Sequence, residues 1–280
     1  MKSIDPEVLA GYNRGIERGR LKSGLGLVEE ARTRELLCEL LPPPPAVVYD
    51  IGGGYGEYAW FLADRGYQTH LFDLAQGNIA ISGELAARYP GRRLADAQVC
   101  DARSVPRPDS SCDALLLMGP LYHIVDPAER AAALAEAHRL LRPGGKLFAA
   151  AITRYATALW AATVFGRDNE LLSEPAFCQM VAHEVATGDH IKPADSAYRG
   201  MGRSYFHLPG QFCSELEAAG FGAVDLRGVV GPGWLAPCLD ERWADPTYRE
   251  GVLRLVRLLE KEDSLMGLST HLLAICEKRA

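Results

Sequence analysis

The chain has 280 residues, of which 48% are hydrophobic and 24% are charged, a composition that excludes a disordered or fibrous chain. With 30 basic and 36 acidic side chains, its formal net charge is −6. Contacts with phosphates supply much of the affinity for long nucleic acid. Such a partner is therefore not expected of a sequence with no basic excess and no basic run.

The sequence predicts neither a targeting segment nor a membrane span. Charged side chains interrupt residues 1–25, which leaves no apolar core of signal-peptide length there. The longest uncharged apolar run near the middle, residues 155–165, is too short to cross a bilayer. The 7 cysteines include no C-x-x-C pair, which favours free thiols in a reducing compartment over a zinc site or disulfides. We therefore expect a cytoplasmic protein with no membrane partner.

Four consecutive prolines, Pro42–Pro45, separate an N-terminal helical segment from the rest of the chain. Proline has no backbone N–H and cannot continue a helix. The preceding stretch, Leu36–Leu41, carries leucines at helical spacing. We expect residues 1–45 to form a helical lid over the site, the alternative being an ordinary solvated helix.

From Ala46 onward, short apolar runs alternate with amphipathic helices. In chain order, strands are expected at Val47–Ile51, Thr69–Phe72, a stretch ending near Val99, Ala114–Leu117, Lys146–Ile152, Ala223–Val230 and Thr270–Cys276. The helix before the fifth strand is expected to stop at Pro143-Gly144-Gly145. This alternation favours an α/β fold, a Rossmann-like, mostly parallel seven-stranded sheet with helices on both faces.

One segment departs from the alternation. Residues 154–208 contain the helix-like pieces Ala156–Phe165 and Phe177–Ala186 but no clear strand. The segment is too long for an ordinary connection, and long insertions in compact domains are usually functional. We expect a helical cap insertion over the substrate site, set between the core at residues 46–153 and the C-terminal part of the core sheet at residues 209–280.

A glycine-rich turn follows the first strand and opens a helix. In Asp50–Gly56, the glycines at positions 52, 54 and 56 allow a tight turn and place no side chain between backbone and ligand. Their G-x-G-x-G spacing differs from the G-x-G-x-x-G fingerprint of dinucleotide-binding folds. No lysine follows as a phosphate-cradling loop requires, so nucleoside triphosphate binding is not expected.

Acidic residues end the next two strands. Asp73 can accept hydrogen bonds from ribose hydroxyls, and Asp101 can accept one from an adenine amino group. Taken singly, each could be a loop aspartate or a helix cap. Together with Asp50 they lie at the carboxyl ends of successive strands, which is where open α/β sheets bind ligands.

These segments together resemble the class I S-adenosylmethionine-dependent methyltransferases. The resemblance covers Val47–Ile152 and rests on the glycine-rich turn, the acids after the second and third strands and Leu141–Gly145. It implies S-adenosylmethionine as cofactor and S-adenosylhomocysteine as product. It further implies that Gly52, Gly54 and Gly56 lie against the methionine part and that Asp50 helps to hold the ammonium. Asp73 would bind the ribose, Asp101 with Ala102 the adenine, and Met118 and Gly119 would pass behind the cofactor. Leu74 is a further expected cofactor-binding residue. The stretch Met118–His123 resembles a bacterial subgroup with a G-P-L-Y-H segment.

Methyl transfer is an in-line displacement, so the protein mainly positions the nucleophile and can remove one proton. Tyr122 and His123 follow the fourth strand, where the resemblance places the methyl group. Histidine can act as a base near neutral pH. His123 is the candidate base, the alternative being that it braces the turn before the helix near Asp126.

Aromatic and polar side chains of the lid, the cap and the turn after the sixth strand are candidates for binding the substrate, although each could equally serve packing. They are Tyr12, Arg154, Tyr155, Tyr198, Arg199, His207 and Trp234. We expect no metal site, because Asp168-Asn169, an acid–amide pair, lies in a stretch typical of a turn.

The sequence favours a methyltransferase acting on an oxygen or nitrogen of a small molecule, such as a secondary metabolite. RNA and protein methyltransferases share the cofactor motif, but no appended binding domain or Asn-Pro-Pro-Tyr-type motif is present. The glycine spacing argues against a NAD-dependent oxidoreductase, and the three retained acids argue against a non-catalytic cofactor-binding protein. We expect a monomer or homodimer.

Overall fold

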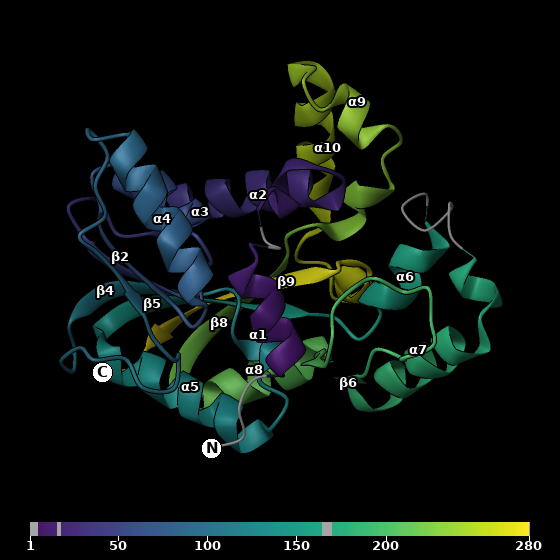
Figure 1. Ribbon diagram of the computed structural model, residues 1–280. Coiled ribbons are helices and arrows are strands. Elements are labelled where there is room, and N and C mark those ends of the chain that lie inside the picture. The colour runs from purple at the N-terminus through teal and green to yellow at the C-terminus, as the bar shows by residue number, and fades with distance from the viewer. Residues whose placement is uncertain (1–4, 16–17, 164–169, 280) are drawn as a thin grey trace.

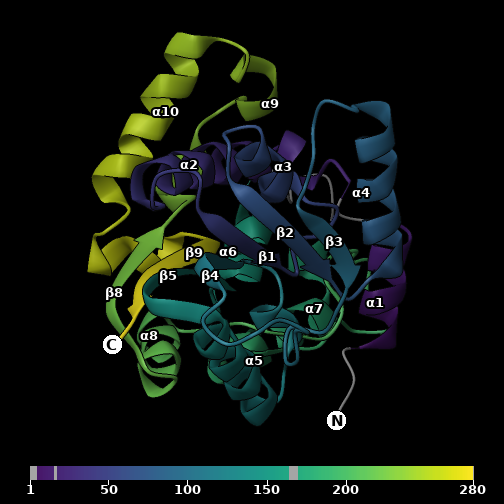
Figure 2. The same cartoon turned by 90° about the vertical axis from the view of Figure 1, so that its left-hand side faces the viewer.

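The computed structural model describes residues 5–15, 18–163 and 170–279 (Figure 1). Seven strands of this described chain form one sheet in the order β3-β2-β1-β4-β5-β9-β8. They are β1 (Val47–Ile51), β2 (Gln68–Asp73), β3 (Asp96–Val99), β4 (Cys112–Leu117), β5 (Leu141–Ile152), β8 (Phe221–Gly228) and β9 (His271–Lys278). The first five are parallel, and β9 runs antiparallel between β5 and β8 (Figure 2). The predicted Rossmann-like fold is confirmed.

Helices cover both faces of the sheet. They are α1 (Pro6–Asn13), α2 (Leu25–Leu40), α3 (Glu57–Ala63), α4 (Gln76–Arg88), α5 (Pro127–Leu140), α6 (Ala156–Ala162), α7 (Pro175–Thr187), α8 (Pro209–Ala218), α9 (Leu239–Arg242) and α10 (Pro246–Leu259). Because successive strand residues point to opposite faces, Leu115 and Leu117 pack with α5 and α8, whereas Leu116 packs with α2, α3 and α10.

Two expectations about local structure were wrong. The fifth strand begins at Leu141 and not at Lys146. Proline disfavours helix at and before its own position, so α5 ends at Leu140, and Leu141 already pairs with Cys112 of β4 ahead of a register shift. The cap contains a short strand pair, β6 (Asp189–His190) with β7 (Ser204–Tyr205). Strands of two residues are too short to show an alternating pattern.

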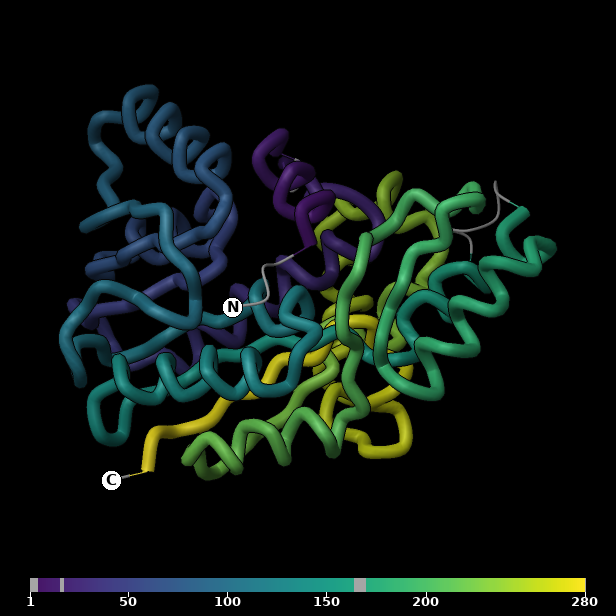
Figure 3. Tube along the Cα trace, turned by 60° about the horizontal axis from the view of Figure 1, so that its bottom comes forward, coloured from purple at the N-terminus to yellow at the C-terminus, as the bar shows by residue number. Residues whose placement is uncertain are grey.

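The parallel strands bring their carboxyl ends together at one end of the sheet, where a site can form. The carboxyl ends of β1, β2 and β4 meet there, as parallel strands require. In Figure 3 the purple N-terminal segment lies between the core and the green cap. The pair Asp168-Asn169 lies outside the described residues.

Candidate active site

The turn between β1 and α3 is shaped by close backbone contacts. Gly52 has φ +69°, and a Cβ built on it would lie 2.4 Å from Cγ of Pro120. A Cβ on Gly119 would lie 2.6 Å from the carbonyl oxygen of Gly52. The glycine-rich turn therefore packs closely on the segment after β4, against the Pro120 ring and the backbone of Gly119, with no room for a Cβ at either glycine.

Asp50 lies under this turn and is 1% exposed. Its Oδ2 has no hydrogen-bond partner among the described residues. Burial, together with the charge of Asp73, raises the pKa of Asp50 to about 7. A Cβ on Gly53 would lie 2.4 Å from this same oxygen, so Gly53 is as necessary as its neighbours. Gly53 is absent from the G-x-G-x-G pattern; the run of three glycines at positions 52–54 is the signal that could have identified it.

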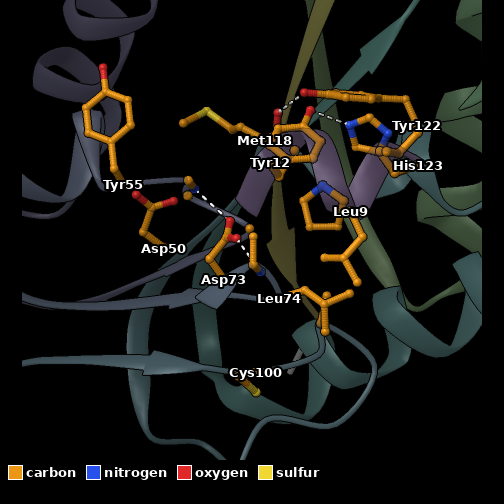
Figure 4. A pocket seen from close by; sticks show the side chains of 18 of the residues that line it. Leu9, Tyr12, Asp50, Tyr55, Asp73, Leu74, Cys100, Met118, Tyr122 and His123 are labelled. Atoms are coloured by element: carbon orange, nitrogen blue, oxygen red, sulfur yellow. Dashed lines mark hydrogen bonds between the residues drawn. The ribbon is translucent and has the colours of Figure 1, made fainter. Parts of the chain in front are cut away.

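Asp73 braces the turn from the end of β2 (Figure 4). One carboxylate oxygen accepts the N–H of Gly54 at 2.8 Å. The other accepts the N–H of Ala75 at 2.8 Å and the side-chain amide of Asn78 at 3.1 Å. Charge-assisted bonds of this kind are among the stronger hydrogen bonds in proteins. Asp73 thereby fixes both the glycine-rich turn and the start of α4.

Asp101 is tied to a neighbouring arginine. It accepts hydrogen bonds from the backbone N–H of Arg103 at 2.9 Å and from its Nε at 2.8 Å. Burial opposes ionisation of Asp101, but the bonds from Arg103 outweigh it and lower the pKa. Arg103 also pairs with Glu129 at the start of α5. A carboxylate therefore stands at this end of the site in its charged form.

His123 ends a short 3-10 helix, Leu121–His123, after β4. A hydrogen bond of 2.7 Å joins its Nε2 to the hydroxyl of Tyr12 on α1, while its Nδ1 is buried without a partner among the described residues. Burial, with a contribution from the charge of Arg20, lowers the pKa of His123 to about 4. The adjacent Tyr122 donates to the carbonyl oxygen of Met118 at 3.3 Å.

One cavity joins these groups. Of the predicted cofactor residues it is lined by Asp50, Gly52, Gly54, Asp73, Leu74, Asp101, Ala102, Met118 and Gly119, and of the predicted catalytic and substrate residues by Tyr12, Tyr122 and His123. Gly56 lies behind the wall, where a Cβ would meet Leu71 and Trp60 at 3.1 and 3.2 Å. Sequence analysis missed the wall residues Val8, Leu9, Arg20 and Tyr58. Val8, Leu9 and Tyr12 share helical spacing, which could have indicated a common face.

The structure does not bring the other predicted substrate residues to this cavity. Trp234 is fully buried in the core between the sheet, α2 and α10. Tyr198 packs against Phe177 inside the cap. Whether an aromatic side chain faces a cavity or a core depends on how distant elements pack, which the local sequence does not encode.

The three polar candidates make hydrogen bonds within the cap or between the cap and the core. Arg154 donates to Gln211 at 2.8 Å and to the carbonyl oxygen of Phe206 at 3.3 Å. His207 is hydrogen-bonded to Glu215 at 3.2 Å. Arg199 donates to carbonyl oxygens of its own loop. The last candidate, Tyr155, is 36% exposed at the start of α6.

The acidic side chains that line the cavity suit S-adenosylmethionine. The cofactor carries positive charge on its ammonium and sulfonium groups, and the cavity presents the carboxylates of Asp50, Asp73 and Asp101. The unpartnered, buried Oδ2 of Asp50 is a site for a cationic hydrogen-bond donor. Among the described residues, no group of three or more His, Cys, Asp or Glu side chains is arranged to hold a metal ion. None of the described helices is long and apolar enough to cross a membrane.

Comparison with known proteins identifies the family. The family model described as "Methyltransferase domain" matches residues 48–145. The chain is 30% identical over 195 residues to an uncharacterised methyltransferase of Mycobacterium tuberculosis, which covers 65% of this chain and 76% of that protein. It is 37% identical over 108 residues to the tRNA (carboxymethyluridine(34)-5-O)-methyltransferase of Macaca fascicularis. This second match spans 37% of this chain and only 14% of the length of that relative.

A solved structure shares the fold. It is the 1,6-didemethyltoxoflavin-N1-methyltransferase of Burkholderia thailandensis with bound 1,6-didemethyltoxoflavin and S-adenosylhomocysteine. The likeness has a TM-score of 0.56 at 18% sequence identity, and covers 98% of this chain and 86% of that one. With the cofactor cradle described above, these comparisons show that the chain belongs to the class I S-adenosylmethionine-dependent methyltransferases.

Proposed function

We propose that this methyltransferase acts on an oxygen or nitrogen atom of a small molecule. The observation that carries the proposal is the apolar part of the cavity lining. Val8, Leu9 and Tyr12 of α1 line the cavity together with the glycine-rich turn, so aromatic and aliphatic side chains are available to contact the acceptor. Pockets lined by apolar side chains with a few polar groups suit small molecules. A folded nucleic acid would need an open, basic surface, whereas the chain has a net charge of −6.

In this proposal different residues of the cavity bind different parts of the cofactor. Asp50 holds the ammonium of the cofactor, Asp73 with Leu74 the ribose, and Asp101 with Ala102 the adenine. Gly52, Gly54 and Gly56 shape the turn along the methionine part, and Met118 and Gly119 lie behind the cofactor. The bound cofactor supplies an electrophilic methyl group. The protein then has to align a nucleophile and exclude water.

The acceptor end is assigned to the segment after β4. His123 is neutral near pH 7 because burial lowers its pKa to about 4, and a neutral imidazole nitrogen can accept a proton. Tyr122 orients the acceptor beside it. The Burkholderia thailandensis neighbour has 1,6-didemethyltoxoflavin bound together with S-adenosylhomocysteine, which supports an acceptor of this size.

We further infer a cytoplasmic enzyme with residues 1–45 as its lid and residues 154–208 as its cap. All 7 cysteines are free, as expected of a reducing compartment.

The test is transfer of tritiated methyl groups from labelled S-adenosylmethionine. The acceptors are a panel of phenols, catechols, amines and nitrogen heterocycles, with bulk unmodified tRNA and a protein extract as competing arms. Parallel calorimetric titrations with S-adenosylhomocysteine and NAD check the cofactor. Labelling of panel compounds, absent in the Asp73→Ala variant, is the expected result. Labelling of tRNA or protein with none of the panel would overturn the proposal.

A further inference from the structure

We propose that Tyr12 and His123 act as a proton-transfer pair, which makes Tyr12 a second catalytic residue contributed by α1. The proposal rests on the proposed function, in which the acceptor is a small molecule carrying an O–H or N–H group.

The geometry of the pair is that of two groups held for proton exchange. The Tyr12 hydroxyl and His123 Nε2 are 2.7 Å apart, although the residues are 111 positions apart in the chain. Their rings meet edge to face, with centroids 5.2 Å apart and an interplanar angle of 81°. Both residues line the cavity that holds the cofactor cradle. Figure 4 shows them facing each other across its upper wall, on the far side of Met118 from Asp50.

Tyr12 stands outside residues 48–145, the segment shared with the methyltransferase domain. Its helix is nevertheless fixed to the core. The side-chain oxygen of Asn13, the next residue, accepts the N–H of Gly77 at 3.0 Å. At the other end of α1, a Cβ on Gly202 of the cap would lie 3.0 Å from the side chain of Val8. The position of the Tyr12 hydroxyl is therefore set by contacts with both α4 and the cap.

His123 is in the neutral form that a proton acceptor requires, and its lowered pKa makes it a weaker base than a free histidine. Burial and the nearby charge of Arg20 lower its pKa to about 4, so the imidazole is neutral in the physiological range. With the Tyr12 hydroxyl donating to Nε2, the ring proton lies on Nδ1, and the phenolic oxygen, which has two lone pairs, can act as an acceptor.

Methyl transfer to the acceptor releases one proton, which the Tyr12–His123 pair takes up. A lone pair of the acceptor oxygen or nitrogen forms the new bond to the methyl carbon. The sulfur–methyl bond breaks, and its electron pair stays on sulfur, which becomes a neutral thioether. The acceptor atom releases its proton to the Tyr12 oxygen as the original Tyr12 proton passes to Nε2 of His123. The imidazolium then loses this proton to solvent when the product leaves.

The first test compares Tyr12→Phe and His123→Gln with Tyr89→Phe and His183→Gln. The control residues are exposed and lie away from the cavity. Turnover is measured with the panel acceptor that the wild type labels most rapidly.

General acid–base groups contribute on the order of 10²–10⁴-fold, so Tyr12→Phe and His123→Gln should each lose about 10²-fold or more in kcat. The double variant should lose little beyond either single one. Affinity for S-adenosylhomocysteine should stay within about threefold of wild type. Full turnover in Tyr12→Phe would overturn the proposal.

The second test needs no acceptor. In protein labelled with ¹⁵N in its histidine rings and saturated with S-adenosylhomocysteine, the His123 signal is assigned by its loss in His123→Gln. The proposal expects a neutral ring protonated on Nδ1 with a hydrogen-bonded Nε2, and a shift of the Nε2 resonance in Tyr12→Phe but not in Tyr89→Phe. An unshifted resonance would refute the pair. If the panel gives no product, the proposed function fails by itself, and this measurement still decides on the pair.

Discussion

The Asp50 carboxylate is buried beside Asp73, and its Oδ2 accepts no hydrogen bond from the described residues. Burying a charge without a partner is costly. Folding raises the pKa of Asp50 from 3.8 to about 7, so the native state binds this proton more tightly than the unfolded chain does. The contribution of Asp50 to stability is therefore present at low pH and is lost as pH rises from about 4 to about 7. At pH 8 the ionised group destabilises the fold.

We predict that Asp50→Asn raises the free energy of unfolding at pH 8, by on the order of 1–4 kcal/mol, since one pKa unit corresponds to about 1.4 kcal/mol. This gain in the free energy of unfolding should vanish as pH falls towards 4.

Wild-type affinity for S-adenosylhomocysteine should weaken below pH 7, by up to about tenfold per pH unit, because Asp50 must then lose its proton to hold the ammonium. The variant should bind more weakly at pH 8 and lack this slope. Denaturation and calorimetry at pH 6 and 8 check both effects; an unchanged slope in the variant would assign it to another group.

At the scale of elements, α1 is covered by little protein. Gly11 is its one buried residue among those described, and Val8, Leu9 and Tyr12 face the cavity. The helix is held partly through Gly77, where a Cβ would lie 2.2 Å from the carbonyl oxygen of Asn13. Backbone at that distance must move, so a side chain at Gly77 would displace α1 from the cavity.

We predict that Gly77→Ala accelerates dissociation of S-adenosylhomocysteine by about threefold to tenfold, the equivalent of one lost hydrogen bond. Gly83→Ala is the matched control, because Gly83 lies on the same helix with nothing within 4 Å of a built Cβ. The control should bind normally and gain roughly 0.5–1 kcal/mol of stability from its helix propensity. Stopped-flow binding and thermal unfolding provide the measurements. Equal dissociation rates in the two variants would show that α1 does not retain the cofactor.

The cap is held together by a buried ionisable pair. Nδ1 of His190 lies 2.6 Å from Oε2 of Glu184, and both side chains are 0% exposed. Thr157 donates to the same oxygen at 2.9 Å, and the His190 ring stacks on Phe206 with centroids 4.8 Å apart. The pair thereby joins α6, α7 and β6 and the residue after β7.

We predict that Glu184→Ala destabilises the cap by about 3–5 kcal/mol, the usual cost of removing one partner of a buried pair. Hydrogen exchange should rise in α7 and around β6 and β7 but not in the central strands. Affinity for S-adenosylhomocysteine should be retained, since no residue of the cap lines the cofactor cavity in the described chain. His183→Ala, at an exposed position of the same helix, is the control. Wild-type exchange in the Glu184 variant would mean that other contacts fix the cap.

Across the whole molecule, the parts predicted correctly from sequence are those with local signals. The strand-and-helix alternation predicted the fold. Asp50, Asp73 and Asp101 lie in or just after the carboxyl ends of β1, β2 and β3, and these ends meet because the strands are parallel. Residues such as Trp234 and Tyr198 carry no local sign of whether they face a cavity or a core. The hydrogen bond from Tyr12 to His123 spans 111 positions and depends on how the lid meets the sheet, which no spacing rule reports.

The distribution of burial leads to a prediction for the whole chain. A ligand that binds only the native state at 100 times its Kd adds about 2.7 kcal/mol to the free energy of unfolding. Apart from this general gain, extra protection from hydrogen exchange should concentrate in α1, residues 50–56 and residues 118–124, because these line the cavity and α1 is little buried without a ligand. Exchange mass spectrometry with and without saturating S-adenosylhomocysteine measures this, with Asp73→Ala as the non-binding control. Local protection that is equally large in α7 and α10 would instead indicate that the cofactor tightens the entire molecule, and that α1 is part of a rigid body and not a separate lid.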